Sequence, residues 1–240
     1  MSINDIIDRM TLAEKIGQLF QVGFSDTTPN DHIRDMIKNY HVGGVIYFSR
    51  NIKNLQQTAK LSNKLQELAL NTGSKIPLFI SADQEGGIVT RLNGGTHFPG
   101  NMALGAAGSG DLARKAGKAT ATELKNTGIN MNLAPVLDVN NNPDNPVIGV
   151  RSFGEDPELV ANLGSSYFEG LQSEGVIACG KHFPGHGDTD LDSHLNLPVI
   201  AHNKKRLNQI ELVPFKRAIT KGIDSIMTAH VHFPAIEKEI

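Results

Sequence analysis

The sequence predicts an α/β protein of the TIM (β/α)8-barrel type, incomplete and with about six strand-helix units present. Short apolar runs, typical of buried strands, alternate with stretches of helical periodicity along all 240 residues. Long polar loops follow several strands, at the carboxyl ends where barrels and open α/β sheets place their active sites. No Gly-rich phosphate-binding fingerprint follows an early strand, which disfavours an open nucleotide-binding sheet and favours the barrel.

Six runs have the composition of parallel strands. Most lack strict apolar-polar alternation, as expected when helices cover both faces of a sheet. The runs are Gly17–Gly23, Gly44–Phe48, Pro77–Ala82, Asn130–Pro135, Val176–Lys181 and Asp224–Ala229.

Three segments between these runs have helical periodicity. In Pro157–Ser173 apolar residues recur at helical spacing, Pro157 suits a first helical position and Gly175 suits the exit. Two more helices are predicted around Leu55–Leu68 and Leu112–Leu124. Long loops remain at Gln84–Gly110, Val136–Glu155 and His182–Asn203, and loops of this length are usually functional or disordered.

A closed barrel needs eight strands, and only six are recognised. We therefore interpret residues 1–240 as a single barrel domain that lacks its last strands. An open barrel exposes sheet edges and part of its apolar interior, so we expect the chain to associate or to be poorly soluble.

Composition excludes several classes of protein. The net charge of −2 gives no electrostatic footprint for nucleic acid. The single Cys179 cannot form an internal disulfide or a thiolate metal cage, and its apolar strand places it in the core. No apolar run approaches a membrane span, and the N-terminus shows no signal peptide. We expect a cytoplasmic protein, or an exported one whose leader is not in this sequence.

The segment KHFPGHGDTDLDSH, residues 181–194, has the highest density of reactive side chains. Its histidines and aspartates suit zinc or iron, but glycines and a proline exclude a regular ligand-bearing helix, so no metal is expected. We favour general acid/base chemistry by Asp192 and His194, because a carboxylate two residues away orients the ring and favours its protonated form. The alternative interpretation is that Asp192 caps a turn and that His194 is an exposed side chain without a catalytic role.

Other strand ends carry candidate ligands for an oxygen-rich molecule. Asp83 directly follows a buried strand and suits the hydroxyl groups of a polyol, with Arg91 close behind. Arg151 follows the loop of the fourth strand and offers a guanidinium. His230 ends the sixth strand, where a lone histidine is more often packed than catalytic.

Four segments, SADQEGG, VIGVRSFGEDP, KHFPGHGDTDLDSH and MTAHVHFPAI, together resemble glycoside hydrolase family 3, and within it the β-N-acetylglucosaminidase (β-hexosaminidase) branch. The resemblance runs from about Thr11 to the last residue. It implies a TIM barrel that removes terminal non-reducing N-acetylglucosamine, from peptidoglycan or chitin fragments, with retention of configuration. The resemblance implies an enzyme that needs no cofactor and whose partner is a small-molecule or oligosaccharide substrate.

The resemblance also implies roles for individual residues. His194 matches the acid/base of this branch and Asp192 its carboxylate partner. The residues that hold the sugar match Asp83, Arg151, Lys181 and His182, to which we add Arg91 for its nearness to Asp83.

Retaining hydrolysis also needs a carboxylate nucleophile. The family carries it at the end of the seventh strand in a segment resembling SDDL, which this sequence lacks. The expected function is thus that of a β-N-acetylhexosaminidase whose nucleophile is missing from this chain, which by itself binds sugar with little or no turnover. A catalytically incomplete carbohydrate-binding fragment, a metal-dependent barrel hydrolase and phosphate as the acceptor are the alternatives.

Overall fold

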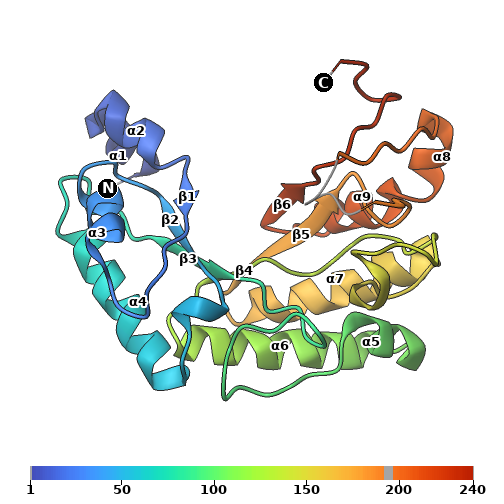
Figure 1. The fold of residues 1–240 in the computed structure, drawn as a ribbon, viewed down its shortest axis with the longest axis horizontal. Coiled ribbons are helices and arrows are strands. Elements are labelled where there is room, and N and C mark those ends of the chain that lie inside the picture. The colour runs from blue at the N-terminus through green and yellow to red at the C-terminus, as the bar shows by residue number, and fades with distance from the viewer. Residues whose placement is uncertain (1, 192–196, 240) are drawn as a thin grey trace. The chain divides into compact units, whose positions relative to one another are not determined.

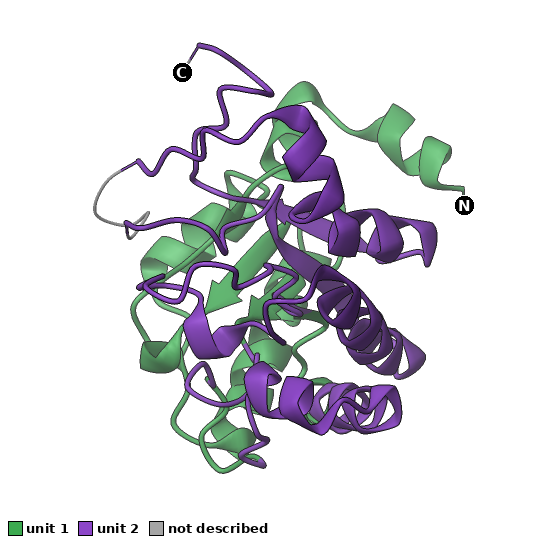
Figure 2. Ribbon diagram, turned by 90° about the vertical axis from the view of Figure 1, so that its right-hand side faces the viewer, with its two compact units in different colours: residues 1–83, 91–95, 123–131 green, residues 84–90, 96–122, 132–240 purple. Residues whose placement is uncertain are grey.

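The computed structural model describes residues 2–191 and 197–239. The chain forms two compact units, which Figure 2 shows in different colours. Unit 1 comprises residues 1–83, 91–95 and 123–131, and unit 2 comprises residues 84–90, 96–122 and 132–240. None of the helices in the described part of the chain combines the length and the apolar character needed to cross a lipid bilayer.

Unit 1 alternates short strands with helices (Figure 1). Its elements are α1 (Ile3–Arg9), α2 (Leu12–Gly17), β1 (Gln21–Val22), α3 (Asp31–Lys38), β2 (Gly44–Tyr47), the 3-10 turn η1 (Ser49–Asn51), α4 (Leu55–Leu70) and β3 (Phe79–Ala82). The strands β1, β2 and β3 pair in parallel, with Gln21 opposite Gly44 and Gly44 opposite Phe79. Tyr47 and Ile80 on these strands are fully buried.

Unit 2 has the same alternation. Its elements are α5 (Asn101–Ala107), most of α6 (Gly110–Asn126), the 3-10 turn η2 (Gly149–Arg151), α7 (Pro157–Ser173), β5 (Ile177–Phe183), α8 (Lys204–Gln209), α9 (Leu212–Thr220) and β6 (Ser225–Thr228). The short β4 (Met131–Asn132) lies at the division between the units. β5 and β6 pair in parallel, with Cys179 opposite Ser225, and the register is irregular between Lys181 and Phe183.

Helix boundaries follow local capping chemistry. Thr11 accepts a hydrogen bond from the Glu14 amide while the Glu14 side chain accepts one from Thr11, which starts α2. Asp156 caps α7, whose first residue is Pro157 as predicted.

Each predicted strand overlaps an observed one, and the parallel pairing confirms the α/β class. β5 runs to Phe183, two residues beyond the predicted end at Lys181. The predicted limits of the first strand are wrong: Gly17 ends α2, and only Gln21 and Val22 form β1. A Cβ on Gly17 would stand 2.1 Å from the Tyr40 carbonyl oxygen, so this glycine serves close backbone packing.

A glycine in the loop after β5 also serves close packing. A Cβ on Gly187 would lie 1.8 Å from the carbonyl oxygen of Val139. Gly187 is therefore required for the close approach of two chain segments rather than for freedom of movement.

Candidate active site

Three charged side chains of unit 2 form a buried cluster. Lys181 Nζ lies 2.6 Å from Glu85 Oε1, and each of these two side chains is 2% exposed. Arg151 forks onto the same carboxylate, with Nε 2.9 Å from Oε2 and Nη2 2.8 Å from Oε1. One carboxylate thus holds two cations in fixed positions.

The local structure explains how these three residues meet. Lys181 lies on β5. Glu85 lies in the turn after β3, where its amide donates to the Val89 carbonyl at 2.9 Å. Arg151 ends η2, and Asn101 donates to its carbonyl oxygen at 2.7 Å.

The charge of Glu85 is preserved despite its burial. Burial alone would raise the pKa of this carboxyl, but the hydrogen bonds and positive charges of Arg151 and Lys181 outweigh it and hold the pKa below its ordinary value. Glu85 is therefore ionised at neutral pH.

A second buried carboxylate, Asp138, orients the next residue along β5. Its Oδ2 lies 2.7 Å from His182 Nδ1, and its Oδ1 accepts a 2.7 Å hydrogen bond from the His186 amide. Burial would raise the pKa of Asp138, but His182 and the two backbone amides lower it below its usual range. Because Asp138 contacts Nδ1, the His182 ring presents Nε2 to a ligand.

His186 fixes the base of the loop after β5. Its Nδ1 lies 2.8 Å from Thr189 Oγ1, and Asn145 donates to the His186 and Gly187 carbonyl oxygens at 2.9 and 3.1 Å. Burial lowers the pKa of the His186 imidazole, against the opposing effect of Asp138. The neutral ring acts as a structural support of the loop.

The predicted sugar-binding residues fall into two groups. In unit 1, Arg91 Nη2 lies 3.8 Å from Asp83 Oδ2, so the structure brings these two together as expected. In unit 2, Arg151, Lys181 and His182 belong to the two carboxylate networks above.

Asp192 and His194, the predicted acid/base dyad, lie outside the described residues. Cys179 is buried, as predicted. His230 is exposed, so the expectation that it is packed is wrong.

Sequence reasoning missed Glu85 and Asp138 as parts of the site. Both follow predicted strands, within the long loops that begin at Gln84 and Val136. Treating every carboxylate at a strand end as a candidate would have found them.

The cluster in unit 2 suits recognition of an oxygen-rich ligand. Buried carboxylates hold a lysine, an arginine and an imidazole in place, and such preorganised donors lose little conformational entropy when they bind oxygen atoms. Polar groups at the carboxyl ends of parallel strands stand where α/β enzymes place their active sites.

The chain belongs to glycoside hydrolase family 3: residues 11–239 match the family model described as the glycosyl hydrolase family 3 N terminal domain. Beta-hexosaminidase A of Pseudoalteromonas piscicida is 45% identical over 217 residues, which are 88% of this chain and 36% of that protein. A beta-hexosaminidase of Nitrosomonas eutropha is 38% identical, over 88% of this chain and 61% of that protein. The chain thus spans between about a third and two thirds of the length of these relatives.

The fold is that of solved members of the family. The structure of a glycoside hydrolase family 3 beta-N-acetylglucosaminidase from Paenibacillus sp. str. FPU-7 matches with a TM-score of 0.94 and 55% identity, over 96% of this chain and 44% of that one. NagZ of Neisseria gonorrhoeae, solved with N-trifluoroacetyl-D-glucosamine, matches with a TM-score of 0.83 and 33% identity, over 91% of this chain and 65% of that one. The predicted fold class, an incomplete (β/α)8-type barrel, is confirmed.

Proposed function

We propose that this chain supplies the sugar-binding site and the acid/base of a retaining β-N-acetylglucosaminidase. The observation that carries the proposal is the buried cluster of Glu85, Arg151 and Lys181 at the carboxyl end of β5, in a chain that belongs to family 3. The substrate class is terminal non-reducing N-acetylglucosamine on peptidoglycan or chitin fragments.

In this proposal the two carboxylate networks position the sugar. Arg151 and Lys181 donate hydrogen bonds to ring hydroxyl groups, and the Nε2 atom of His182, whose Nδ1 faces Asp138, accepts one. Because Glu85 and Asp138 already hold the cationic groups and the imidazole, binding requires little rearrangement of them.

His194 acts as general acid and then as general base. Asp192 favours the protonated imidazole, which gives its proton to the departing glycosidic oxygen while a carboxylate attacks the anomeric carbon. Water then attacks the glycosyl-enzyme bond, His194 accepts the water proton, and the carboxylate is released as N-acetylglucosamine forms. We propose that the attacking carboxylate lies outside these 240 residues, because the sequence contains no Ser-Asp-Asp segment.

Release of 4-nitrophenol from 4-nitrophenyl N-acetyl-β-glucosaminide tests this function. We expect little or no turnover by the 240-residue chain and measurable turnover by a longer chain that carries the strand-seven aspartate. N-acetylglucosamine binding without turnover by the longer chain would instead favour a carbohydrate-binding protein.

Substitution of His194 in the active longer chain tests its proposed role as the acid/base. His194→Ala should slow substrates with poor leaving groups far more than activated aryl glycosides, because only the former need protonation. Equal slowing of both substrates would remove His194 from this role. Loss of activity on chelation with recovery on adding zinc would favour a metal-dependent hydrolase.

A further inference from the structure

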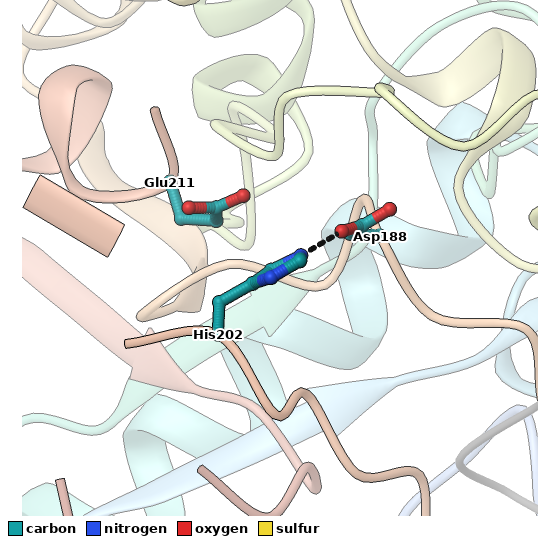
Figure 3. A group of neighbouring side chains, drawn as sticks. All are labelled: Asp188, His202 and Glu211. Carbon is teal, nitrogen blue, oxygen red and sulfur yellow. Dashed lines mark hydrogen bonds and ion pairs between the residues drawn. The ribbon is translucent and has the colours of Figure 1, made fainter. Parts of the chain in front are cut away.

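Three side chains of unit 2 that the proposed reaction does not use form a separate cluster. Asp188 follows β5, His202 precedes α8, and Glu211 directly precedes α9. Their nearest potential ligand atoms all lie within 4.8 Å of one another. Figure 3 shows the His202 ring between the two carboxylates, with Nε2 hydrogen-bonded to Asp188 Oδ2.

One carboxylate oxygen in this cluster has no hydrogen-bond partner among the described residues. The Glu211 side chain is 2% exposed. Its Oε1 accepts hydrogen bonds from Asn141 Nδ2 at 3.1 Å and from Arg206 Nη2 at 3.3 Å. Its Oε2 is buried and accepts none from the described residues. A buried carboxylate oxygen without a partner is costly, so Oε2 points to an electropositive ligand.

The charges around the cluster are unbalanced in the same direction. Arg206 is the cation that contacts both carboxylates, with Nη2 3.9 Å from Asp188 Oδ2. Among the described residues, the two carboxylates therefore outnumber the one guanidinium that contacts both of them. A divalent cation would balance the second carboxylate at a site from which water is partly excluded.

We propose that Asp188, His202 and Glu211 bind a divalent transition-metal ion, and that zinc fits best. An imidazole with two carboxylates suits zinc, whereas magnesium and calcium prefer oxygen ligands alone. Zinc bonds of about 2.0–2.2 Å require the ligand atoms to stand about 3.3 Å apart. Atoms of the cluster that are farther apart must therefore approach by up to about 1.5 Å, and the hydrogen-bonded atoms of Asp188 and His202 must separate. A water molecule completes the coordination.

The ion has a structural role in this proposal. It ties the segment after β5 to the segment before α8 and to the start of α9. His202 binds the metal through a ring nitrogen that carries no proton, so protons compete with zinc for it as the pH falls.

Calorimetric titration of the metal-free 240-residue chain with zinc chloride tests the site. We expect one equivalent to bind, a rise in the melting temperature, and no comparable binding of magnesium chloride. His202→Ala and Glu211→Gln should each weaken zinc binding about tenfold or more, because loss of even an outer partner of a ligand costs about that much. Asp188→Asn, which preserves shape, is the variant to use if either of these does not fold.

Two matched histidine variants locate the bound ion. His230→Ala removes an exposed imidazole that is not part of the cluster, and it should leave zinc affinity unchanged. His194→Ala should also leave it unchanged. The proposal is overturned if the wild-type chain binds no zinc, if His202→Ala binds it as tightly, or if His194→Ala loses it.

Discussion

Lys181 is a buried lysine whose ammonium group is held in a fixed position by an ion pair. Its ammonium lies 2.6 Å from Glu85 Oε1 and its side chain is 2% exposed. A charge in such a place is tolerated only because its partner is equally buried and is itself shared with Arg151. The three residues therefore depend on one another for stability as well as for recognition.

Removing the charge of Lys181 should destabilise the fold. Lys181→Met keeps most of the stem but leaves Glu85 with Arg151 alone, and we expect a loss of about 1–3 kcal/mol in the free energy of unfolding. Urea titration measures this loss. Lys221→Met is the matched control, because Lys221 pairs with Glu169 at the surface, where such a pair contributes about 0–1 kcal/mol. Equal effects of the two substitutions would contradict the importance of the buried pair.

Glu85 should also give the fold a dependence on acid pH. Its pKa is lower in the folded chain than in the unfolded chain, so its stabilising contribution is present above the unfolded value of about 4.3. The contribution is lost as the pH falls through the lower, folded value.

Comparison with Glu85→Gln isolates this effect. The variant should be less stable at pH 7 and should lose less further stability than the wild type between about pH 5 and pH 3. Asp138, whose pKa is also lowered, keeps a residual slope in both proteins. Unfolding free energies from urea titrations at several pH values measure the slopes, and identical slopes would exclude Glu85 as their source.

At the scale of elements, α6 and α7 pack through reciprocal glycines. A Cβ on Gly117 of α6 would lie 2.1 Å from the Tyr167 carbonyl oxygen, and one on Gly170 of α7 would lie 2.3 Å from the Arg114 carbonyl oxygen. Each contact involves backbone, which cannot rotate away. The two helices can approach this closely only because neither glycine carries a side chain.

Gly117→Ala and Gly170→Ala should each destabilise the fold by about 1–3 kcal/mol, the typical cost of overpacking. A decrease in stability would be decisive, because helix propensity alone predicts the opposite: alanine favours a helix over glycine by about 0.5–1 kcal/mol. Thermal and urea unfolding measure the effect. Gly73→Ala is the control, since the nearest atom to its added Cβ is a side-chain oxygen of Glu14 at 3.5 Å. Stabilisation by both helical substitutions would show that the helices can separate without cost.

The elements were more predictable from sequence than the site. Apolar runs bounded by Gly and Pro are a local signal, so β2, β3, β5 and β6 were found within about two residues. The carboxylates were missed because their burial depends on distant partners. Glu85 is hydrogen-bonded to Arg151, which is 66 positions away in the sequence. Asp138 is hydrogen-bonded to His182, which is 44 positions away. A sequence pattern does not record such pairings.

At the scale of the whole molecule, the N-terminal part of unit 1 exposes an unusual amount of apolar surface. Ile3, Leu12 and Leu19 are 75%, 73% and 82% exposed. With Ile7, Ile16 and Phe79 they line one groove in which few polar atoms are accessible. A contiguous apolar surface of this kind favours association.

We therefore expect the 240-residue chain to associate reversibly as its concentration rises. Leu12→Lys combined with Leu19→Lys should shift the chain towards monomer, because the burial of each leucine in a contact contributes about 1.5–3 kcal/mol and a charge there opposes contact. Sedimentation velocity over a range of concentrations measures the shift. Leu112→Lys, at a 48% exposed position on α6, is the matched control and should leave association unchanged. A wild-type chain that is monomeric at every concentration, or a control as effective as the double variant, would show that this groove does not drive association.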